Sequence, residues 1–486
     1  MLLALALRVA TIDVQGLWLD EIFTVNVTAG DDLGRVWSLI RQTENTPPLY
    51  YLLGWGWRQV VGSGDVDLRL LSALVGSLAV WPTALLARRV AGPRHGAAAG
   101  LLAGLLLAVN PLAHWMGQEA RTYALLLLVA GIAWLALVVA LEDPTPGRLW
   151  RWALAAAALA WTHYFGLLVL GLGWLLVLRR MRGTGAPILP RAAVAPLALS
   201  GAAALALVPI ALDQQSTGMY NGIASGGGLL ERTLAAPKQF AVGYAAPVED
   251  PLGFGVALLL AAVLLGGWRA ARADGGAARR AALVGGLAAV VWLVPELAAI
   301  AGFDVVLSRN LLLLMPALWA LVGIAAAAGP RWSRVGVGVV VAVQLGVIAW
   351  VAVTPGAQRD DWRGAFRAAA VGGGPQLLLV DRDQLLPVVH YVPGAWRLPT
   401  SSPEGRGFHS IAVIDRPAAR GKDVPRVRPI PAPPVRGMRL VRAQERSDQW
   451  RIYVWAAPAA GATVPVTAQD VSSLRRAASK AAYVVP

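Results

Sequence analysis

Long apolar runs alternate with short polar segments through the first 354 residues. A membrane-crossing helix needs about 20 largely apolar residues, within a range of roughly 17–25. Helical runs are therefore expected near 1–12, 68–87, 96–112, 122–141, 150–163, 165–178, 192–212, 252–268, 281–301, 308–328 and 335–354. The first is short for a full crossing, and the fifth and sixth are short enough to form a hairpin. The pattern predicts an α-helical polytopic membrane protein with about 11 transmembrane helices.

The polar segment at 13–67, between the first two runs, is long enough to hold structure of its own. It contains two amphipathic stretches, Ile22–Val27 and Leu33–Ile40. Amphipathic helices with one apolar face lie along a membrane surface. We expect both stretches to be helices of this kind.

The pattern changes after Thr354, where runs become short and strand-like. "PQLLLVDRDQLLPVVHYV" predicts a strand ending at Asp381 and then a helix, while "SIAVID", "GMRLVRA" and "WRIYVWA" predict further strands. We therefore expect a transmembrane domain over 1–354 and a small α/β domain over 355–456. The Pro-rich stretch 424–435 is expected to be a loop or linker, and 457–486 a poorly ordered tail.

Composition supports the membrane assignment. Hydrophobic residues make up 57% of the 486 residues, charged residues only 15%, and the mean hydropathy is +0.56. A soluble domain carries about 25% charged residues. The absence of cysteine excludes disulfides and cysteine metal sites.

The net charge of +15 follows membrane topology. From Gln358 onward, 19 Lys and Arg face 10 Asp and Glu, so +9 of the charge lies in the tail. One set of short loops carries 15 basic residues and the opposite set carries 7. The positive-inside rule places the richer set in the cytoplasm, and places the loops 13–67 and 213–250 and the tail outside. The distribution argues against a nucleic-acid partner.

Polar residues that could carry chemistry gather in the loops predicted to lie outside. "LWLDE" and "TENTPPLYY" belong to the first outer loop, "GQEARTY" opens the fourth run, "THYFG" joins the fifth and sixth, and "LSRN" opens the tenth. The candidates are Asp20, Glu21, Glu44, Asn45, Tyr50, Gln118, Glu119, Arg121, Tyr123, His163, Tyr164 and Arg309.

These residue types suit group transfer from a lipid phosphate to a hydroxyl. A carboxylate such as Asp20 can act as a general base, and Arg121 and Arg309 can hold a phosphate through charge-assisted hydrogen bonds. Asp20 and Glu119 are also candidate ligands for a divalent cation such as Mg, Mn or Zn. Charges within a membrane are costly, so such groups line a watery cavity or pair with each other.

Each candidate also has a structural explanation. Asp20 and Glu21 could be solvated charges at a membrane edge, Glu119 and Arg121 a structural ion pair, and His163 a buried core residue. A transporter or flippase for a lipid-linked or acidic solute is the main alternative function. It would have inverted repeats with broken helices at the membrane midplane. A non-catalytic member whose tail binds envelope polymer is a third possibility.

The order of the motifs resembles one family. "LWLDE", "TPPLYYLL", "QEARTYALLLL", "THYFGLLVL", "SRNLLLLMPAL" and "QRDDWR" together look like the membrane glycosyltransferases with the GT-C fold. Within these, the chain resembles the bacterial protein-mannosyltransferase-like group, glycosyltransferase family 39, over about 15–370. Thr46 departs from the pattern, because the family often has His before the Pro-Pro pair.

The resemblance implies an enzyme of the bacterial plasma membrane with its active site and C-terminal domain outside. It implies a polyprenyl-phosphate-linked sugar donor (possibly mannose), transfer that inverts the anomeric carbon, and a protein, lipid or polysaccharide acceptor. Asp20 matches the catalytic carboxylate, Glu21 its acidic neighbour, and Glu119 a second acidic residue that shapes the site. Arg121 and Arg309 match donor-phosphate positions. The substrate-binding residues implied or expected are Glu44, Asn45, Tyr50, Gln118, Tyr123, His163 and Tyr164.

Overall fold

The computed structural model forms two compact units. The first comprises Met1–Ile12 and Thr24–Val353, and the second Asp13–Phe23 and Thr354–Pro486. The residues described are 1–183, 191–216, 228–271, 275–381, 385–397, 406–415, 435–446, 450–459, 461–467, 469–470 and 480–485. The chain passes from the first unit to the second between Val353 and Thr354, and the predicted domain bounds stay a prediction. The membership of Asp13–Phe23 in the second unit was not predicted.

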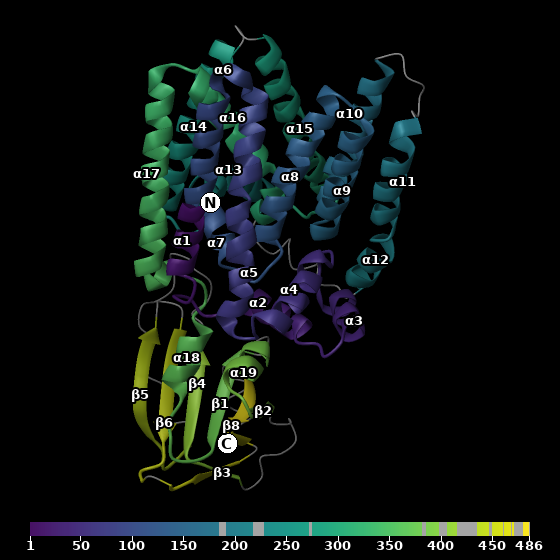
Figure 1. The fold of residues 1–486 in the computed structure, drawn as a ribbon. Helices are drawn as coiled ribbons and strands as arrows, with labels where there is room; N and C mark the ends of the chain where they lie inside the picture. Colours follow the sequence, from purple (N-terminus) through teal and green to yellow (C-terminus); the bar gives the residue numbers. More distant parts are fainter. Residues whose placement is uncertain are drawn as a thin grey trace. The chain divides into compact units, whose positions relative to one another are not determined.

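The first unit is helical (Figure 1). Its elements are α1 (Leu2–Ala10), α3 (Leu33–Thr43), α4 (Leu49–Val60), α5 (Asp65–Leu78), α6 (Val80–Val109), α7 (Pro111–Gly117), α8 (Tyr123–Glu142), α9 (Pro146–Thr162), α10 (Gly166–Arg182), α11 (Arg191–Leu205), α12 (Val208–Ser216), α13 (Leu229–Val242), α14 (Glu249–Ala271), α15 (Gly275–Ile300), the 3-10 helix η2 (Ser308–Leu314), α16 (Met315–Ala328) and α17 (Arg331–Val353). The helix α2 (Leu19–Thr28) begins in the second unit and ends in the first.

Among the described residues, 7 segments are long and apolar enough to cross a membrane. They are Asp65–Val109, Tyr123–Glu142, Arg191–Ser216, Glu249–Ala270, Gly275–Ile300, Ser308–Ala328 and Arg331–Val353. The α-helical polytopic architecture is therefore confirmed. The number of crossings stays a prediction, since α9 and α10 have only 17 residues each.

The segment Asp65–Val109 contains two of the predicted runs because α6 turns back on itself. Gly92 has φ 74°, a left-handed value that suits glycine, and Pro93 starts the second half. A Cβ on Gly100 would lie 2.8 Å from the carbonyl oxygen of Ala84, so the two halves pack with almost no space between them. The glycines of the second half thus permit a close antiparallel hairpin.

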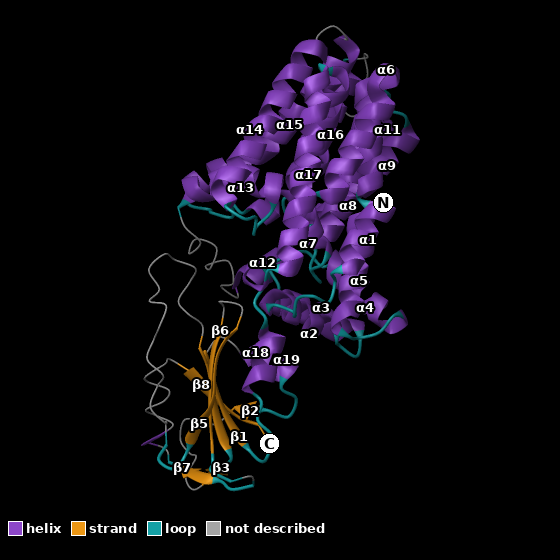
Figure 2. Ribbon diagram, turned by 90° about the vertical axis from the view of Figure 1, so that its left-hand side faces the viewer, coloured by secondary structure: helices purple, strands orange, loops and turns teal. Residues whose placement is uncertain are grey.

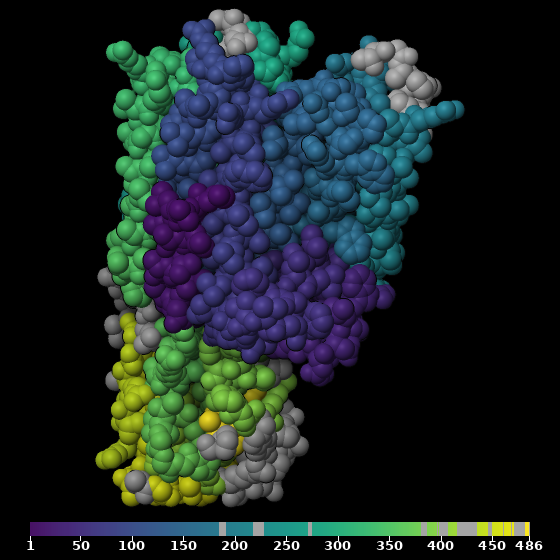
Figure 3. All heavy atoms as spheres, viewed as in Figure 1, coloured from purple at the N-terminus to yellow at the C-terminus, as the bar shows by residue number. Residues whose placement is uncertain are grey.

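The helix α1 has 9 residues here, which extend about 14 Å. Leu2 is 84% exposed, and the helix lies on the surface of its unit (Figure 3, purple). Its Arg8 is fully buried and donates to the backbone oxygen of Ala113 at 3.0 Å. This bond joins α1 to α7, where the candidate residues begin.

Both amphipathic stretches are helices, which confirms that part of the prediction. Asp32 begins α3 by accepting a bond from the backbone nitrogen of Arg35 at 2.8 Å. Their position at a membrane surface stays a prediction. The helix α13 was missed, because its polar residues and Pro237 hide any apolar period in the loop 213–250.

The second unit has a six-stranded sheet with the strand order β2-β8-β1-β4-β6-β5. Its elements are η3 (Pro355–Ala357), α18 (Trp362–Ala369), β1 (Gln376–Asp381), α19 (Leu385–Tyr391), β2 (Trp396–Arg397), β3 (Arg406–Phe408), β4 (Ser410–Asp415), β5 (Arg439–Arg446), β6 (Trp450–Ala456), β7 (Val464–Val466) and β8 (Lys480–Val485). Figure 2 shows α18 and α19 on one face of the sheet. There Trp362 packs on Trp450 with ring centroids 4.0 Å apart. The predicted α/β domain and its four strands are confirmed.

The prediction of a poorly ordered tail is wrong for two strands. β7 pairs with β3 in a separate two-stranded sheet, and β8 lies between β1 and β2 in the main sheet. Short apolar stretches such as "AYVV" become strands only when a sheet edge is available, and this cannot be seen locally. The predicted Pro-rich loop lies outside the described residues except for Val435.

Candidate functional site

A buried polar network in the first unit joins α2, the α3–α4 loop and the α7–α8 loop. Arg121 donates to Glu44 at 2.8 Å, and the side chains are 5% and 2% exposed. The hydroxyl of Tyr51 donates to the same Glu44 oxygen at 2.6 Å and lies 2.8 Å from the hydroxyl of Thr46. Arg121 also donates to the hydroxyl of Thr24 at 3.1 Å. Arg121 thus forms an ion pair with Glu44, which sequence reasoning did not pair with it.

Tyr51 is held protonated by this environment. Burial raises its pKa well above the ordinary value, and Glu44 adds to the rise while Arg121 opposes it. The guanidinium carbon of Arg121 lies 5.8 Å from the centre of the Tyr51 ring. Such a neutral phenol can donate to a carboxylate, which is what it does toward Glu44.

The α7–α8 loop carries three of the candidate residues. Gln118 donates to the backbone oxygen of Arg8 at 2.7 Å and to the hydroxyl of Thr11 at 2.6 Å, which ties the loop to α1. The backbone nitrogen of Arg121 donates to the backbone oxygen of Glu119 at 2.7 Å, forming a tight turn. The side chain of Glu119 is almost completely buried.

Three candidates from distant parts of the sequence lie next to one another. The guanidinium carbon of Arg309 lies 5.9 Å from the centre of the Tyr123 ring. The ring of Tyr123 lies 6.5 Å from that of His163, which ends α9. Arg309 is the second residue of η2, so η2, α8 and the α9–α10 junction converge on one place.

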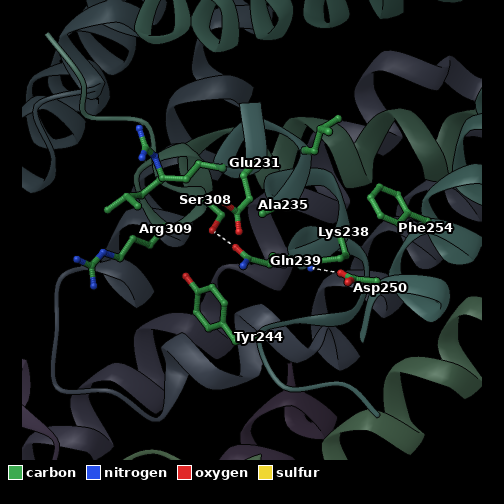
Figure 4. Close-up of a pocket in the computed structure, with 12 residues that line it drawn as sticks. Glu231, Ala235, Lys238, Gln239, Tyr244, Asp250, Phe254, Ser308 and Arg309 are labelled. Carbon is green, nitrogen blue, oxygen red and sulfur yellow. Dashed lines mark hydrogen bonds and ion pairs between the residues drawn. The ribbon is translucent and has the colours of Figure 1, made fainter. Parts of the chain in front are cut away.

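Beside Arg309 is a polar cavity of about 690 Å³, bounded by α13, the first turn of α14 and η2 (Figure 4). Its polar lining includes Lys238, Gln239, Tyr244, Ser308 and Arg309. Ser308 donates to Gln239, and Lys238 bonds to Asp250 at 2.7 Å. The lining also holds the carboxylates of Glu231 and Asp250, so an anion would bind at the end with Arg309 and Tyr244.

Arg232 and Lys238, which line this cavity, both form ion pairs with acidic residues. Arg232 forms an ion pair with Asp304, and Lys238 pairs with Asp250 and with Glu249 at 3.0 Å. Burial lowers the pKa of Lys238, but the hydrogen bonds and charges of Asp250 and Glu249 outweigh it and leave the pKa raised. Lys238 therefore stays a cation at neutral pH.

Tyr244 connects the cavity to the α7–α8 loop. Burial raises the pKa of its phenol, Arg309 and a hydrogen bond with Ser308 oppose the rise, and Tyr123 and Glu119 add to it. Its ring meets that of Trp115 edge to face, with centroids 5.9 Å apart. A neutral hydroxyl thus lies among Arg309, Ser308 and Glu119.

The rim of the cavity is apolar. Leu234 on α13 is 48% exposed and Phe254 on α14 is 44% exposed, and both line the cavity. An opening with apolar edges and a polar interior suits the head group of an amphiphile that approaches from the membrane. Lys238, Gln239, Tyr244 and Ser308 were not predicted. The sequence signal available for them was a long polar loop between two apolar runs.

The remaining candidates of the first unit lie in other contacts. The hydroxyl of Tyr50 lies 2.7 Å from that of Ser72, which fixes α4 on α5, and the Tyr50 side chain is fully buried. Tyr164 donates to Gln214 at 2.8 Å, and Gln214 in turn donates to the backbone oxygen of Thr46 at 3.0 Å. Asn45 follows Glu44 and is half-buried. Gln214 is a further polar residue that sequence reasoning missed.

In the second unit, the two adjacent acids at the start of α2 lie in different environments. Glu21 is fully buried, and its carboxylate accepts a bond from the backbone nitrogen of Trp18 at 3.4 Å, so it caps its own helix. Asp20 is partly exposed. The geometry therefore distinguishes a helix-capping acid from one that can reach a substrate.

The residues before α2 pack against the tail of the chain. The hydroxyl of Tyr391 accepts a bond from the backbone nitrogen of Leu17 at 2.7 Å, and Arg363 bonds to Asp13 at 2.6 Å. The backbone nitrogen of Arg359 donates to Gln15 at 2.8 Å. The predicted catalytic segment thus belongs structurally to the C-terminal unit.

No group of three or more His, Asp or Glu side chains that could hold a metal ion occurs within the described ranges of the chain. The predicted cation ligands Asp20 and Glu119 belong to different units.

Residues 45–211 match the family model described as dolichyl-phosphate-mannose-protein mannosyltransferase. Among solved structures, the chain is similar to ArnT from Cupriavidus metallidurans in the apo state, with 15% identity, 93% of this chain and 96% of that chain covered, and a TM-score of 0.51. The same ArnT bound to undecaprenyl phosphate gives 19% identity and a TM-score of 0.47 over 75% of this chain and 66% of that one. An oligosaccharyltransferase of Archaeoglobus fulgidus in complex with Zn and sulfate gives 11% identity and a TM-score of 0.41. The match covers 75% of this chain and 54% of that chain. A search of curated protein sequences gives no match.

The likeness to apo ArnT extends over nearly the whole of both chains. The chain therefore has the GT-C fold, as the order of its motifs predicted. The family match and the apolar helices agree with a multi-pass membrane protein.

Proposed function

We propose that the chain transfers a sugar from a polyprenyl-phosphate-linked donor to a hydroxyl on the outer side of a bacterial plasma membrane. The polar cavity beside Arg309 is the observation that carries this proposal, since it joins anion-binding groups to an apolar rim. The matched family acts with a phosphorylated polyprenyl lipid by its own description. Mannose is the first sugar to test for the same reason.

In this proposal the donor phosphate lies against Arg309, with Tyr244 as a neutral hydrogen-bond donor. The prenyl chain leaves the cavity past the exposed Leu234 and Phe254. Arg121 was predicted to share the phosphate. Its buried ion pair with Glu44 favours a positioning role, in which it holds the α7–α8 loop that carries Glu119.

The transfer step is a single displacement at the anomeric carbon. The acceptor oxygen forms a bond to that carbon while the bond to the phosphate oxygen breaks, which inverts the configuration. The acceptor proton passes to the carboxylate of Asp20. The departing polyprenyl phosphate keeps the negative charge, which Arg309 stabilises.

Asp20 is preferred to Glu21 as the base because Glu21 is buried and caps α2. Asp20 stands one turn before Thr24 in the same helix, and Thr24 accepts a bond from Arg121. Adding Mg, Mn or Zn to the transfer assay tests the expected divalent cation. The GT-C fold supports transfer in preference to the transporter alternative.

The test uses membranes that contain the full chain, together with several labelled polyprenyl-phospho-sugars. Asp20→Asn is expected to reduce transfer of the label by at least about 10²-fold, because loss of a general base costs typically 10²–10⁴-fold. Membrane insertion should be unchanged. Asp31→Asn, an exposed acid of the same predicted loop, is the matched control. Near-normal transfer by Asp20→Asn would refute the base assignment, and no transfer from any donor by the unaltered protein would refute the function.

A further inference from the structure

A second cavity lies at the opposite end of α14 from the polar cavity. Its volume is about 440 Å³, and α14, α15 and α16 bound it. Every residue that lines it is apolar or glycine, including Leu265, Trp268, Ala282, Gly286 and Leu321. The cavity is an apolar groove within a helical unit that crosses the membrane.

Small residues keep this groove open. A Cβ on Gly286 would meet nothing within 4 Å, whereas one on Gly285 would lie 3.6 Å from the side chain of Leu321. Leu265 is 62% exposed and Trp268 is 38% exposed, so the groove opens at the surface of its unit. Its shape and lining suit a hydrocarbon chain.

Two exposed arginines lie beside one end of the groove. Arg269 follows Trp268 and stands one helical turn after Leu265, and Arg279 stands on the α15 face of Ala282 and Gly286. The neighbouring Arg280 has another role, because it donates to the backbone oxygen of Val90 at 3.1 Å. The groove therefore ends at two positive charges and an indole, a combination typical of a membrane interface.

We propose that this groove is a binding site for an anionic diacyl phospholipid. One acyl chain lies against Gly286 and Leu321, and the phosphate contacts Arg269 and Arg279. The charges favour a phospholipid over the tail of a polyprenyl donor, since that tail ends in uncharged hydrocarbon. The donor phosphate belongs to the polar cavity at the other end of α14.

The test measures lipid binding by the purified, delipidated full chain in detergent. Phosphatidylglycerol, phosphatidylcholine and undecaprenyl phosphate are titrated separately, with native mass spectrometry and the melting temperature as readouts. We expect one phosphatidylglycerol to bind at least about tenfold more tightly than phosphatidylcholine and to raise the melting temperature. The measurement needs no sugar transfer, so its result is independent of the proposed enzymatic function.

Two variants locate the site. Gly286→Leu fills the groove and is expected to abolish the tight binding of phosphatidylglycerol. Gly171→Leu is its control, because a Cβ on Gly171 also meets nothing within 4 Å. The double variant Arg269→Gln/Arg279→Gln should weaken binding about tenfold, and Arg151→Gln, an exposed arginine on α9, should not.

Three results would overturn the proposal. One is equal binding of phosphatidylglycerol and phosphatidylcholine, which would indicate ordinary membrane solvation. Another is unchanged binding by both groove variants. The third is undecaprenyl phosphate competing for the Gly286-dependent site more strongly than phosphatidylglycerol, which would assign the groove to the donor tail.

Discussion

Individual residues in the first unit divide into those that hold the site together and those that face the cavity. Arg121, Glu44 and Tyr51 are buried and bonded to one another, whereas Arg309 lines open space. Sequence reasoning found Arg121, Glu44 and Arg309 because charges are rare among apolar runs, but it named Tyr50 in place of Tyr51. It could not pair them, because the Glu44–Arg121 bond joins positions 77 residues apart.

The ion pair between Arg121 and Glu44 should be important for stability. Glu44→Gln is expected to lower the free energy of unfolding by about 3–5 kcal/mol, since it leaves a buried charge without its partner. The measurement is the melting temperature and denaturant midpoint in detergent.

The matched control is Glu142→Gln, which removes the carboxylate of the surface pair with Arg89. A surface pair contributes about 0–1 kcal/mol. Equal losses in the two variants would contradict the structural role of the buried pair. Combining Glu44→Gln with Arg121→Gln should cost less than the sum of the single changes.

Tyr51 should make the first unit sensitive to alkaline pH. Its folded-state pKa lies well above the unfolded value of about 10, mainly through burial. The resulting stabilisation is complete below pH 10 and is lost as pH rises toward the folded-state pKa, because the unfolded phenol ionises first. Melting temperatures between pH 9 and 11 should fall less steeply in Tyr51→Phe. An identical slope in both proteins would show that Tyr51 does not contribute.

At the scale of elements, the apolar pattern predicted most helices of the first unit within a few residues. The run at 122–141 became α8 and that at 335–354 became α17, because a long apolar run has few alternatives to a helix. The pattern did not predict α13, which lines the polar cavity. Its apolar residues, such as Ala236 and Phe240, are separated by charged and polar ones, so no long apolar run marks it.

Close packing of α16 on α6 should depend on Gly323. A Cβ there would lie 2.6 Å from the backbone oxygen of Ala99, and a backbone atom cannot move aside easily. Gly323→Ala is expected to destabilise the unit by about 1–3 kcal/mol through overpacking. Gly338→Ala, where a Cβ meets nothing within 4 Å, should be neutral or slightly stabilising in a melting experiment. Similar melting temperatures for the two variants would disprove the packing argument.

At the scale of the whole molecule, the division near residue 354 followed from the change in sequence pattern. Two features of the second unit did not follow from the sequence pattern. The last strand β8 joins the main sheet, and Asp13–Phe23 belongs with the C-terminal unit. Both depend on long-range partners such as β1 and Tyr391, which no local window of sequence contains.

The end of the chain should therefore be needed for the second unit to fold. Ala482 on β8 is fully buried, so Ala482→Asp places a charge in the core and should disrupt the sheet. Limited proteolysis of the full chain should then cleave this unit faster. Val441→Asp, at a position that is 45% exposed on β5, is expected to leave the cleavage rate unchanged. Unchanged cleavage of Ala482→Asp would mean that β8 is dispensable.

The bond between Leu17 and Tyr391 bears on how this chain can diverge or be recombined. A chimera that exchanges only the C-terminal domain between relatives would separate Tyr391 and Arg363 from the N-terminal strip that they hold. Productive recombination therefore needs three crossovers, one on each side of residues 13–23 and one before the tail, so that both segments move together. The segment that carries the proposed base Asp20 therefore has to be exchanged together with a domain more than three hundred residues away.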